Sequence, residues 1–236
     1  MRLDAIVTVG REAEDPIRLG MALATFASWA RQARLGRVRV IGQSWGASAE
    51  LWDLCARHGC VPSEVVQLDP VESQRGRHVQ AAALATTDVY GICDSDIVLL
   101  PHLVVEDCGR PDPPWHEYVA GLLRDRPKYA MLSALPEPGG MRPPMGGTDG
   151  HVWQVQNTGG IRFVRRGVVT PDAPPRHPDG GGGYDRDLCY WLDSRGWSVG
   201  YAIRLLAVHL GYGTSSVWRD DPEGAVDWRE PEGRRL

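Results

Sequence analysis

The sequence predicts an α/β fold in which a mostly parallel β-sheet is flanked by helices. Over its first hundred residues, short runs rich in β-branched residues alternate with longer segments whose apolar residues recur at helical spacing. Strands that alternate with helices imply right-handed β-α-β connections and therefore a parallel sheet. The second half is less regular, because glycine- and proline-rich stretches separate its expected elements.

Boundary signals define the first strand and the first helix. The strand Ala5–Val9 is closed by Gly10, and Asp15 offers a helix N-cap directly before Pro16. Gly36 supplies the stop of this helix. The other elements expected in the first half are strands Val38–Ile41, Val65–Leu68 and Val89–Cys93, a helix between Ser48 and Gly59, and a helix from about Gln74 to Thr86.

The second half is expected to add two helices and several strands around two long loops. The loops cover residues 136–150 and 171–183, and loops of this length inside a compact domain are often functional lids. The expected elements are helices His116–Arg126 and Asp185 to about Arg195, and strands Tyr129–Ala134, Ile161–Val164, Trp197–Ile203 and Leu205–His209. Neither an internal repeat nor an interdomain linker interrupts the chain, so we expect one domain over residues 1–236.

Composition excludes several classes of protein. With 236 residues and 42% hydrophobic content, the chain can fill one core, and a net charge of −4 argues against a nucleic-acid-binding surface. The five cysteines are odd in number and lack CxxC spacing, which favours reduced thiols over a zinc site or a disulfide framework. No apolar run approaches the roughly 20 residues of a membrane span, and Asp4 interrupts any secretory signal. We therefore expect a soluble, cytoplasmic protein.

Two carboxylates, Asp94 and Asp96, follow the fourth expected strand directly. Hard oxygen ligands of this kind suit Mg²⁺ or Mn²⁺. A solvated acidic turn explains the pair equally well in isolation. However, Gly10 and Gln43 also follow strands, and ligands of parallel sheets bind beyond the carboxyl ends of the strands. The pattern therefore predicts a charged site at this edge, in an enzyme that acts on a phosphate-bearing substrate.

Three groups of residues occur in an order that adds specificity to this acidic pair. They are the segments Gln74–Ala81 with Asp88–Tyr90 and Asp94–Asp96, Gly183–Cys189 with Leu192 and Arg195–Trp197, and Val208–Gly211. In this order the sequence resembles the nucleotide-sugar-dependent glycosyltransferases of the GT-A type, most nearly those of family 2. The resemblance covers about residues 5 to 215. It implies a Rossmann-like nucleotide-binding half over about residues 1–100, an acceptor-side half over about 101–218 and a loosely packed tail over 219–236.

The resemblance implies a metal-dependent transfer of a sugar from a nucleoside diphosphate to a hydroxyl acceptor. Mn²⁺ or Mg²⁺ would be held by the Asp94–Ser95–Asp96 segment, with Asp96 as the metal ligand and Asp94 also on the ribose side. His209 is a candidate third ligand, although a lone histidine at a strand end is more often structural. The expected donor is a UDP-sugar, with GDP or dTDP left open. The expected acceptor is a small metabolite.

Asp185 is the candidate general base, which would take the proton of the acceptor hydroxyl and so give inversion. A plain helix N-cap is the alternative explanation of this residue. The chain has Tyr184 where the family carries an acidic partner, so Asp187 is held in reserve as the base.

The resemblance also implies further residues that bind the donor or the acceptor. Those expected on the donor side are Thr8, Gly10, Arg11, Gln43, Arg75, Arg77 and Asp94. Those expected on the sugar or acceptor side are Asn157, Gly159, Gly160 and Trp153, which lies in a loop-like stretch. For the two arginines a solvated helix face is an equal alternative, and for residues 157–160 a plain β-turn.

Two competing functions stay open. A sugar-nucleotide pyrophosphorylase, which is a nucleotidyltransferase, also places carboxylates on a metal at sheet ends. The single glycine of Gly10-Arg11-Glu12 counts against its glycine-rich phosphate loop. A non-catalytic relative that binds a nucleotide sugar is the other alternative.

Overall fold

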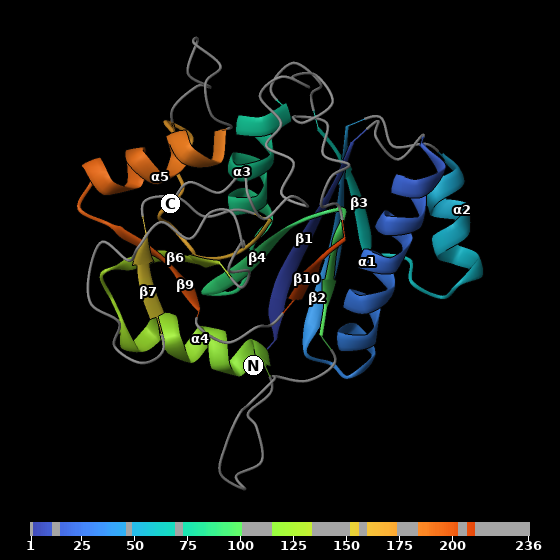
Figure 1. Cartoon of the computed structure of the whole chain (residues 1–236), viewed down its shortest axis with the longest axis horizontal. Coiled ribbons are helices and arrows are strands. Elements are labelled where there is room, and N and C mark those ends of the chain that lie inside the picture. Colours follow the sequence, from blue (N-terminus) through green and yellow to red (C-terminus); the bar gives the residue numbers. More distant parts are fainter. Residues whose placement is uncertain are drawn as a thin grey trace, which may run out of the picture.

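The computed structural model describes residues 2–10, 15–45, 49–68, 73–100, 115–133, 152–155, 160–173, 184–202 and 207–210 (Figure 1). Fifteen elements occur in these ranges. They are β1 (Leu3–Gly10), α1 (Pro16–Arg34), β2 (Val38–Trp45), α2 (Ala49–Arg57), β3 (Glu64–Gln67), α3 (Ser73–Leu84), β4 (Val89–Asp94), β5 (Ile97–Leu99), α4 (Trp115–Asp125), β6 (Tyr129–Ser133), β7 (Val152–Val155), β8 (Ile161–Arg165), α5 (Tyr184–Ser194), β9 (Ser198–Ala202) and β10 (Ala207–His209).

The main sheet of the described chain has eight strands in the order β3-β2-β1-β4-β8-β6-β9-β7. The half that contains β3, β2, β1 and β4 is parallel throughout, and every antiparallel pair of this sheet involves β7 or β8. Strands β5 and β10 form a separate antiparallel pair. The chain first adds strands on one side of β1 and then returns to place β4 on the other side. The topological switch point therefore lies between β1 and β4, where ligands of such sheets bind.

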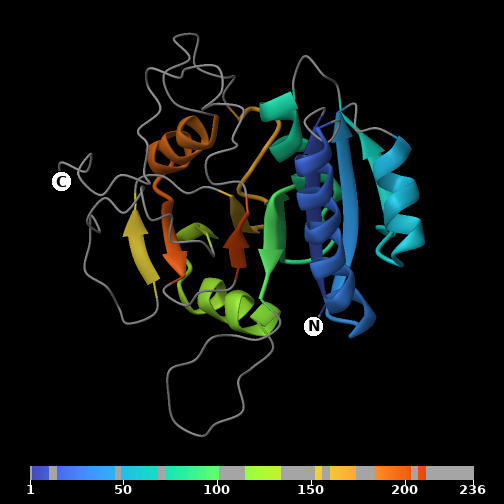
Figure 2. The same ribbon diagram turned by 45° about the vertical axis from the view of Figure 1, so that its right-hand side comes forward.

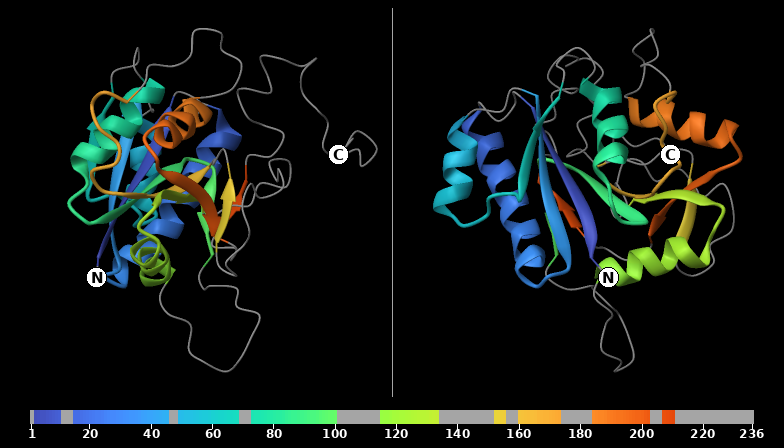
Figure 3. Two further views of the ribbon diagram at one scale, coloured as in Figure 1. Left: turned by 90° about the vertical axis from the view of Figure 1, so that its left-hand side faces the viewer. Right: turned by 180° about the vertical axis from the view of Figure 1, so that it is seen from behind.

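Helices cover both faces of the main sheet. Apolar residues of α1, α2 and α4 pack with Leu3, Ala5 and Val7 on one face. Those of α3 and α5 pack with Ile6 and Ile41 on the other face. Figure 2 shows α1 in front of the parallel strands, and the left panel of Figure 3 shows α1 and α3 on opposite sides of the sheet. No helix in the described ranges is long and apolar enough to cross a membrane.

The predicted fold class is confirmed, and so are the boundary signals of the first helix. Asp15 caps α1 by accepting hydrogen bonds from the backbone N–H groups of Ile17 and Arg18. Gly36 follows the end of α1 with φ of +70°, a conformation that residues with a side chain rarely adopt.

Two short strands were not predicted. The apolar run after Asp96 forms β5, and the segment around Trp153 forms β7 rather than a loop, so the loop-like placement of Trp153 was wrong. Trp153 pairs in register with Tyr201 of β9. Strands of three or four residues lack the length that makes a periodic pattern recognisable. The predicted loop 136–150, residues 174–183 of the second loop and the tail 219–236 lie outside the described residues.

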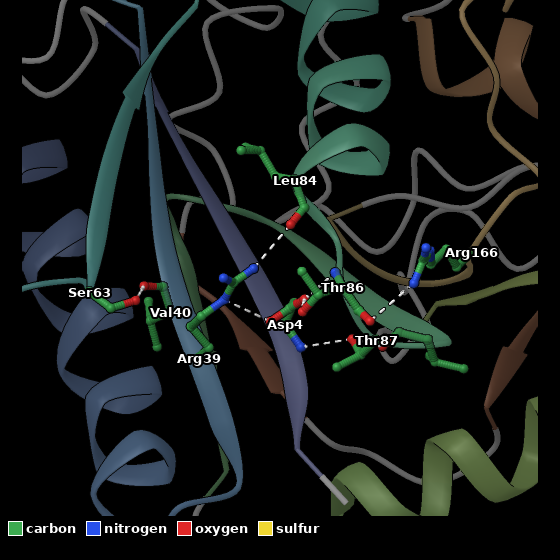
Figure 4. Close-up of polar contacts among 9 residues, drawn as sticks. Asp4, Arg39, Val40, Ser63, Leu84, Thr86, Thr87 and Arg166 are labelled. Carbon is green, nitrogen blue, oxygen red and sulfur yellow. Dashed lines mark hydrogen bonds and ion pairs between the residues drawn. The ribbon is translucent and has the colours of Figure 1, made fainter.

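A buried carboxylate fastens the end of α3 to the sheet (Figure 4). Asp4 of β1 is 2% exposed and accepts hydrogen bonds from the backbone N–H (2.6 Å) and the hydroxyl (2.9 Å) of Thr86. Nε of Arg39, directly opposite on β2, donates to Asp4 at 2.9 Å, while its Nη2 donates to the carbonyl of Leu84 at 3.0 Å. Burial alone would raise the pKa of Asp4. The Thr86 and Arg39 contacts outweigh it, so the pKa lies below its ordinary value.

We expect Asp4→Asn to lower the free energy of unfolding by about 1–3 kcal/mol at pH 7, because Arg39 and Thr86 lose a charged acceptor. The folded-state pKa of Asp4 is lowered, so its contribution is complete above the ordinary pKa of 3.8 and is lost as pH falls through the lower folded value. The stability difference between wild type and variant should therefore shrink in acid. Urea denaturation at pH 7 and below pH 4 measures both effects.

Asp125→Asn is the matched control, because its side chain is 70% exposed and its nearest ion pair is long. Its effect should stay within about 0.5 kcal/mol at either pH. Equal effects of the two substitutions would contradict the role given to Asp4.

Candidate functional site

Polar side chains form a row across three neighbouring strands at the carboxyl edge of the parallel half-sheet. In the strand register, Thr8 of β1 lies opposite Gln43 of β2 on one side and opposite Asp94 of β4 on the other. Each of the three comes two residues after a core residue, namely Ile6, Ile41 or Ile92. These core residues lie on the face of the sheet that α3 and α5 cover. Since side chains two residues apart share a face, the row faces α3 at the switch point of the sheet.

Gln43 joins this row to α3. Its side-chain carbonyl accepts from the Thr8 hydroxyl at 2.8 Å, and its Nε2 donates to the backbone carbonyl of Arg77 at 3.0 Å and to Oε1 of Gln80 at 2.8 Å. Gln80 in turn donates to the carbonyl of Gln67 at 3.0 Å. Gln43 is fully buried, so this network fixes the position of α3 against β1 and β2. Direct contact of Gln43 with a donor base stays a prediction.

Arg77 forms an ion pair with the first aspartate of the acidic segment. Its Nη1 lies 2.6 Å from Oδ1 of Asp94, and the two side chains are 11% and 29% exposed. A solvated helix face, which the sequence left equally open for this residue, is thereby excluded. The pair places a positive charge beside the acidic segment.

The turn Asp94–Ser95–Asp96 is held by α1 on one face of the sheet and by the residue that precedes the neighbouring strand β8. On the α1 side, the buried Thr25 donates its hydroxyl to the carbonyl of Ser95 at 2.9 Å, and the hydroxyl of Ser28 accepts from the N–H of Leu99 at 3.1 Å. On the β8 side, the N–H of Asp94 donates to the carbonyl of Gly160 at 3.1 Å. Gly160, predicted from sequence on the acceptor side, therefore lies against the acidic segment.

The strand that carries His209 lies beside the second aspartate. His209 of β10 pairs with Ile97 of β5, and the N–H of Leu210 donates to the carbonyl of Asp96 at 2.7 Å. The sequence argument required this strand to lie beside the acidic segment, and it does. Among the described side chains no group of three or more His, Cys, Asp or Glu is positioned to hold a metal ion, but the His209 side chain is outside that set.

Asp185 lies in the first turn of α5, which begins one residue earlier at Tyr184. The residues before Tyr184 lie outside the described ranges, so the N-cap explanation of Asp185 stays open. Its role as a base stays a prediction, as does that of the half-buried Asp187.

Several predicted residues cannot be placed as side chains. Arg11, Asn157 and Gly159 lie outside the described residues. For Arg75 in α3, Trp153 in β7, Asp185 in α5 and His209 in β10 the backbone alone is described. Gly10 ends β1, next to the polar row.

Sequence reasoning missed several residues that lie around the polar row of Thr8, Gln43 and Asp94 and help to hold it in place. Gln80, the Thr25–Ser28 pair and Arg162 were not singled out. Arg162 is fully buried and lies opposite Ile92, so it shares the face of Asp94 on the adjacent strand. Polar residues three apart on a helix face were the available signal, since both Arg77 with Gln80 and Thr25 with Ser28 show it.

Cys93, directly before Asp94, is not a candidate nucleophile. The thiol is fully buried, and burial raises its pKa well above the ordinary value. A thiol that stays protonated and shielded is inert.

Solved structures of similar architecture cover nearly the whole chain. A mannosyltransferase from Pyrobaculum calidifontis, in complex with GDP-Man and Mn²⁺, matches 92% of this chain and 59% of its own with a TM-score of 0.54 and 13% identity. TarS of S. aureus in complex with UDP matches 88% of this chain and 60% of its own, with a TM-score of 0.52 and 10% identity. A putative glucose-1-phosphate thymidylyltransferase from Bacillus anthracis, in complex with a sucrose, matches 94% of both chains with a TM-score of 0.51 and 9% identity.

No family model matches the chain, and no curated protein matches its sequence. The chain spans about three fifths of the mannosyltransferase, at 59% of its length. At identities of 9 to 13% the likeness concerns the fold. The chain has a GT-A-type fold, as the order of its sequence motifs predicted.

We expect Gln43→Leu to lower the free energy of unfolding by about 1–3 kcal/mol, because Thr8, Gln80 and the Arg77 carbonyl lose a buried partner. Hydrogen exchange of α3 should accelerate, since the helix loses its tie to β2. The matched control is Gln67→Leu, at an exposed position of β3. An unchanged stability in Gln43→Leu would show that the network does not hold α3.

Proposed function

We propose that the protein is a metal-dependent glycosyltransferase that moves a sugar from a nucleoside diphosphate to a hydroxyl acceptor with inversion. The observation that carries the proposal is the position of Asp94–Ser95–Asp96 at the switch point, between the ion pair with Arg77 and the strand of His209. The GT-A-type fold supports it, as do similar structures that contain GDP-Man with Mn²⁺ and UDP.

The residues present fit a divalent cation. Mg²⁺ and Mn²⁺ sites commonly use one or two carboxylates and complete their coordination with substrate phosphates and water. Asp96 with His209 would hold Mn²⁺ or Mg²⁺, with Asp94 beside them. When bound, the cation would supply the positive charge that stabilises the leaving nucleoside diphosphate.

The chain's own groups would perform the remaining steps. Asp94, fixed by Arg77, would orient the ribose of the donor, and Thr8, Gly10, Arg11 and Arg75 would line the rest of the nucleotide site. Asp185 would accept the proton of the acceptor hydroxyl as its oxygen bonds to the anomeric carbon and the bond from that carbon to the diphosphate breaks. Asn157, Gly159, Gly160 and Trp153 would contact the transferred sugar or the acceptor. A UDP-sugar is favoured as donor, and a small metabolite as acceptor.

A nucleotidyltransferase is the second candidate, because the thymidylyltransferase-like structure matches 94% of both chains. In that reaction a sugar 1-phosphate would attack a nucleoside triphosphate and release pyrophosphate. Incubation with nucleoside triphosphate and sugar 1-phosphate, followed by pyrophosphate detection, distinguishes it from donor turnover. A relative that binds a nucleotide sugar without turnover would bind UDP or GDP in calorimetry and release neither product.

We expect Asp96→Ala to reduce metal-dependent release of nucleoside diphosphate from UDP-, GDP- and dTDP-sugars by at least about a hundredfold, because the cation loses its carboxylate. The binding of Mn²⁺, followed by calorimetry, should weaken in parallel. Asp53→Ala, which removes an exposed carboxylate of α2, is the control and should retain both. Retention of full metal-dependent turnover by Asp96→Ala would refute the metal assignment.

We expect Asp185→Asn to reduce sugar transfer about 10²- to 10⁴-fold while donor binding changes little, because the amide cannot accept the proton. Asp193→Asn, at an exposed position of the same helix, should transfer at the wild-type rate. If Asp187→Asn loses transfer instead, the base is Asp187. Anomeric configuration of the product, read by proton NMR, tests inversion.

A further inference from the structure

A cavity lies at the end of the sheet opposite to the candidate active site. Its volume is about 560 Å³, and it is lined by Asp88 and Val89 before and in β4, by Arg165, Arg166 and Gly167 at the end of β8, and by Ala120 and Arg124 of α4. Val89 begins β4 and Asp94 ends it. At about 3.3 Å per residue, the two places are roughly 16 Å apart along the strand.

The cavity has a surplus of positive charge. Three guanidinium groups line it against the single carboxylate of Asp88. Within the described ranges, no carboxylate lies within ion-pair distance of Arg165 or Arg166. Arg124 approaches its neighbour Asp125 at 3.8 Å, and both of these side chains are at least 70% exposed, so that pair neutralises little.

Backbone carbonyls hold two of the guanidinium groups in place. Arg165 donates from Nε to the carbonyl of Tyr129 at 3.3 Å and from Nη2 to those of Leu123 (2.5 Å) and Arg126 (3.4 Å). Arg166 donates from Nη1 to the carbonyl of Thr86 at 3.1 Å (Figure 4). Nη1 of Arg165, and Nε and Nη2 of Arg166, donate to no group of the described chain. Oriented cationic donors therefore remain for a ligand.

We propose that this cavity binds the phosphate group of a small molecule through Arg124, Arg165 and Arg166. Guanidinium groups present paired N–H donors that match phosphate oxygens, and charge-assisted hydrogen bonds are the stronger ones. The volume lies within the range of small-molecule sites, so there is room for more than a lone anion. The chemistry suits a free pyrophosphate or a phosphorylated sugar. This site goes beyond the proposed transfer reaction and does not depend on it.

Calorimetric titration of the full chain with inorganic pyrophosphate and with glucose 1-phosphate, in EDTA, tests the proposal. We expect saturable binding that weakens about tenfold or more for each of Arg124→Gln and Arg166→Gln, since each removes a charged donor. Arg165 is left intact because it holds the end of α4. Tighter binding of glucose 1-phosphate identifies a phosphorylated sugar as the ligand class, and tighter binding of pyrophosphate identifies the free anion.

Two control variants separate this site from others. Arg31→Gln with Arg57→Gln removes the same charge from exposed positions of α1 and α2 and should bind like wild type. Arg77→Gln removes the guanidinium of the candidate active site and should also retain this binding. The proposal is overturned by the absence of saturable binding up to about 10 mM, by equal affinity in the Arg124→Gln/Arg166→Gln variant, or by loss of binding in the Arg77→Gln variant alone.

Discussion

The placement of α3 depends on polar contacts at both of its ends. Among the described apolar residues of this helix only Ala81 is buried, while Val79, Ala82 and Leu84 pack against the core but stay partly exposed, so burial contributes modestly to its docking. Near its beginning, Gln43 fixes the Arg77 carbonyl, and just beyond its end Asp4 fixes Thr86. These buried, nearly fully paired groups define one position and rotation of the helix. The Arg77–Asp94 ion pair exists because of that constraint, and the electrostatics of the acidic segment follow from it.

The ion pair between Arg77 and Asp94 also gives the two aspartates of the acidic segment different electrostatic surroundings. Arg77 neutralises Asp94 at 2.6 Å, whereas Asp96 lies beyond the end of β4 and beside the strand of His209. Two carboxylates this close in sequence repel each other, and a fixed guanidinium lowers that cost. This asymmetry supports the proposed division of roles, in which Asp96 would meet the metal and Asp94 the ribose.

Much of the fold could be read from the sequence, and less of the site. The cap at Asp15, the stop at Gly36 and the apolar run ending at Asp94 are local signals, and each defined its element correctly. The insertion of β8 between β4 and β6 is a long-range pairing with no local signal. The partners of Gln43 depend on the rotation of α3, which tertiary contacts set. The sequence therefore located Asp94 at the edge but could not show that Arg77 faces it.

Arg165 and Arg166, at the opposite edge of the sheet, have a structural role that leaves some of their N–H donors available for a ligand. The carbonyls at the end of a helix carry partial negative charge and attract a cation. Arg165 satisfies them for α4, as Arg166 satisfies the carbonyl of Thr86 after α3. Each contact uses part of a guanidinium group that has five N–H donors. Because the backbone neutralises these arginines only through dipoles, their full charge remains, and it faces a cavity whose lining contains a single carboxylate, that of Asp88.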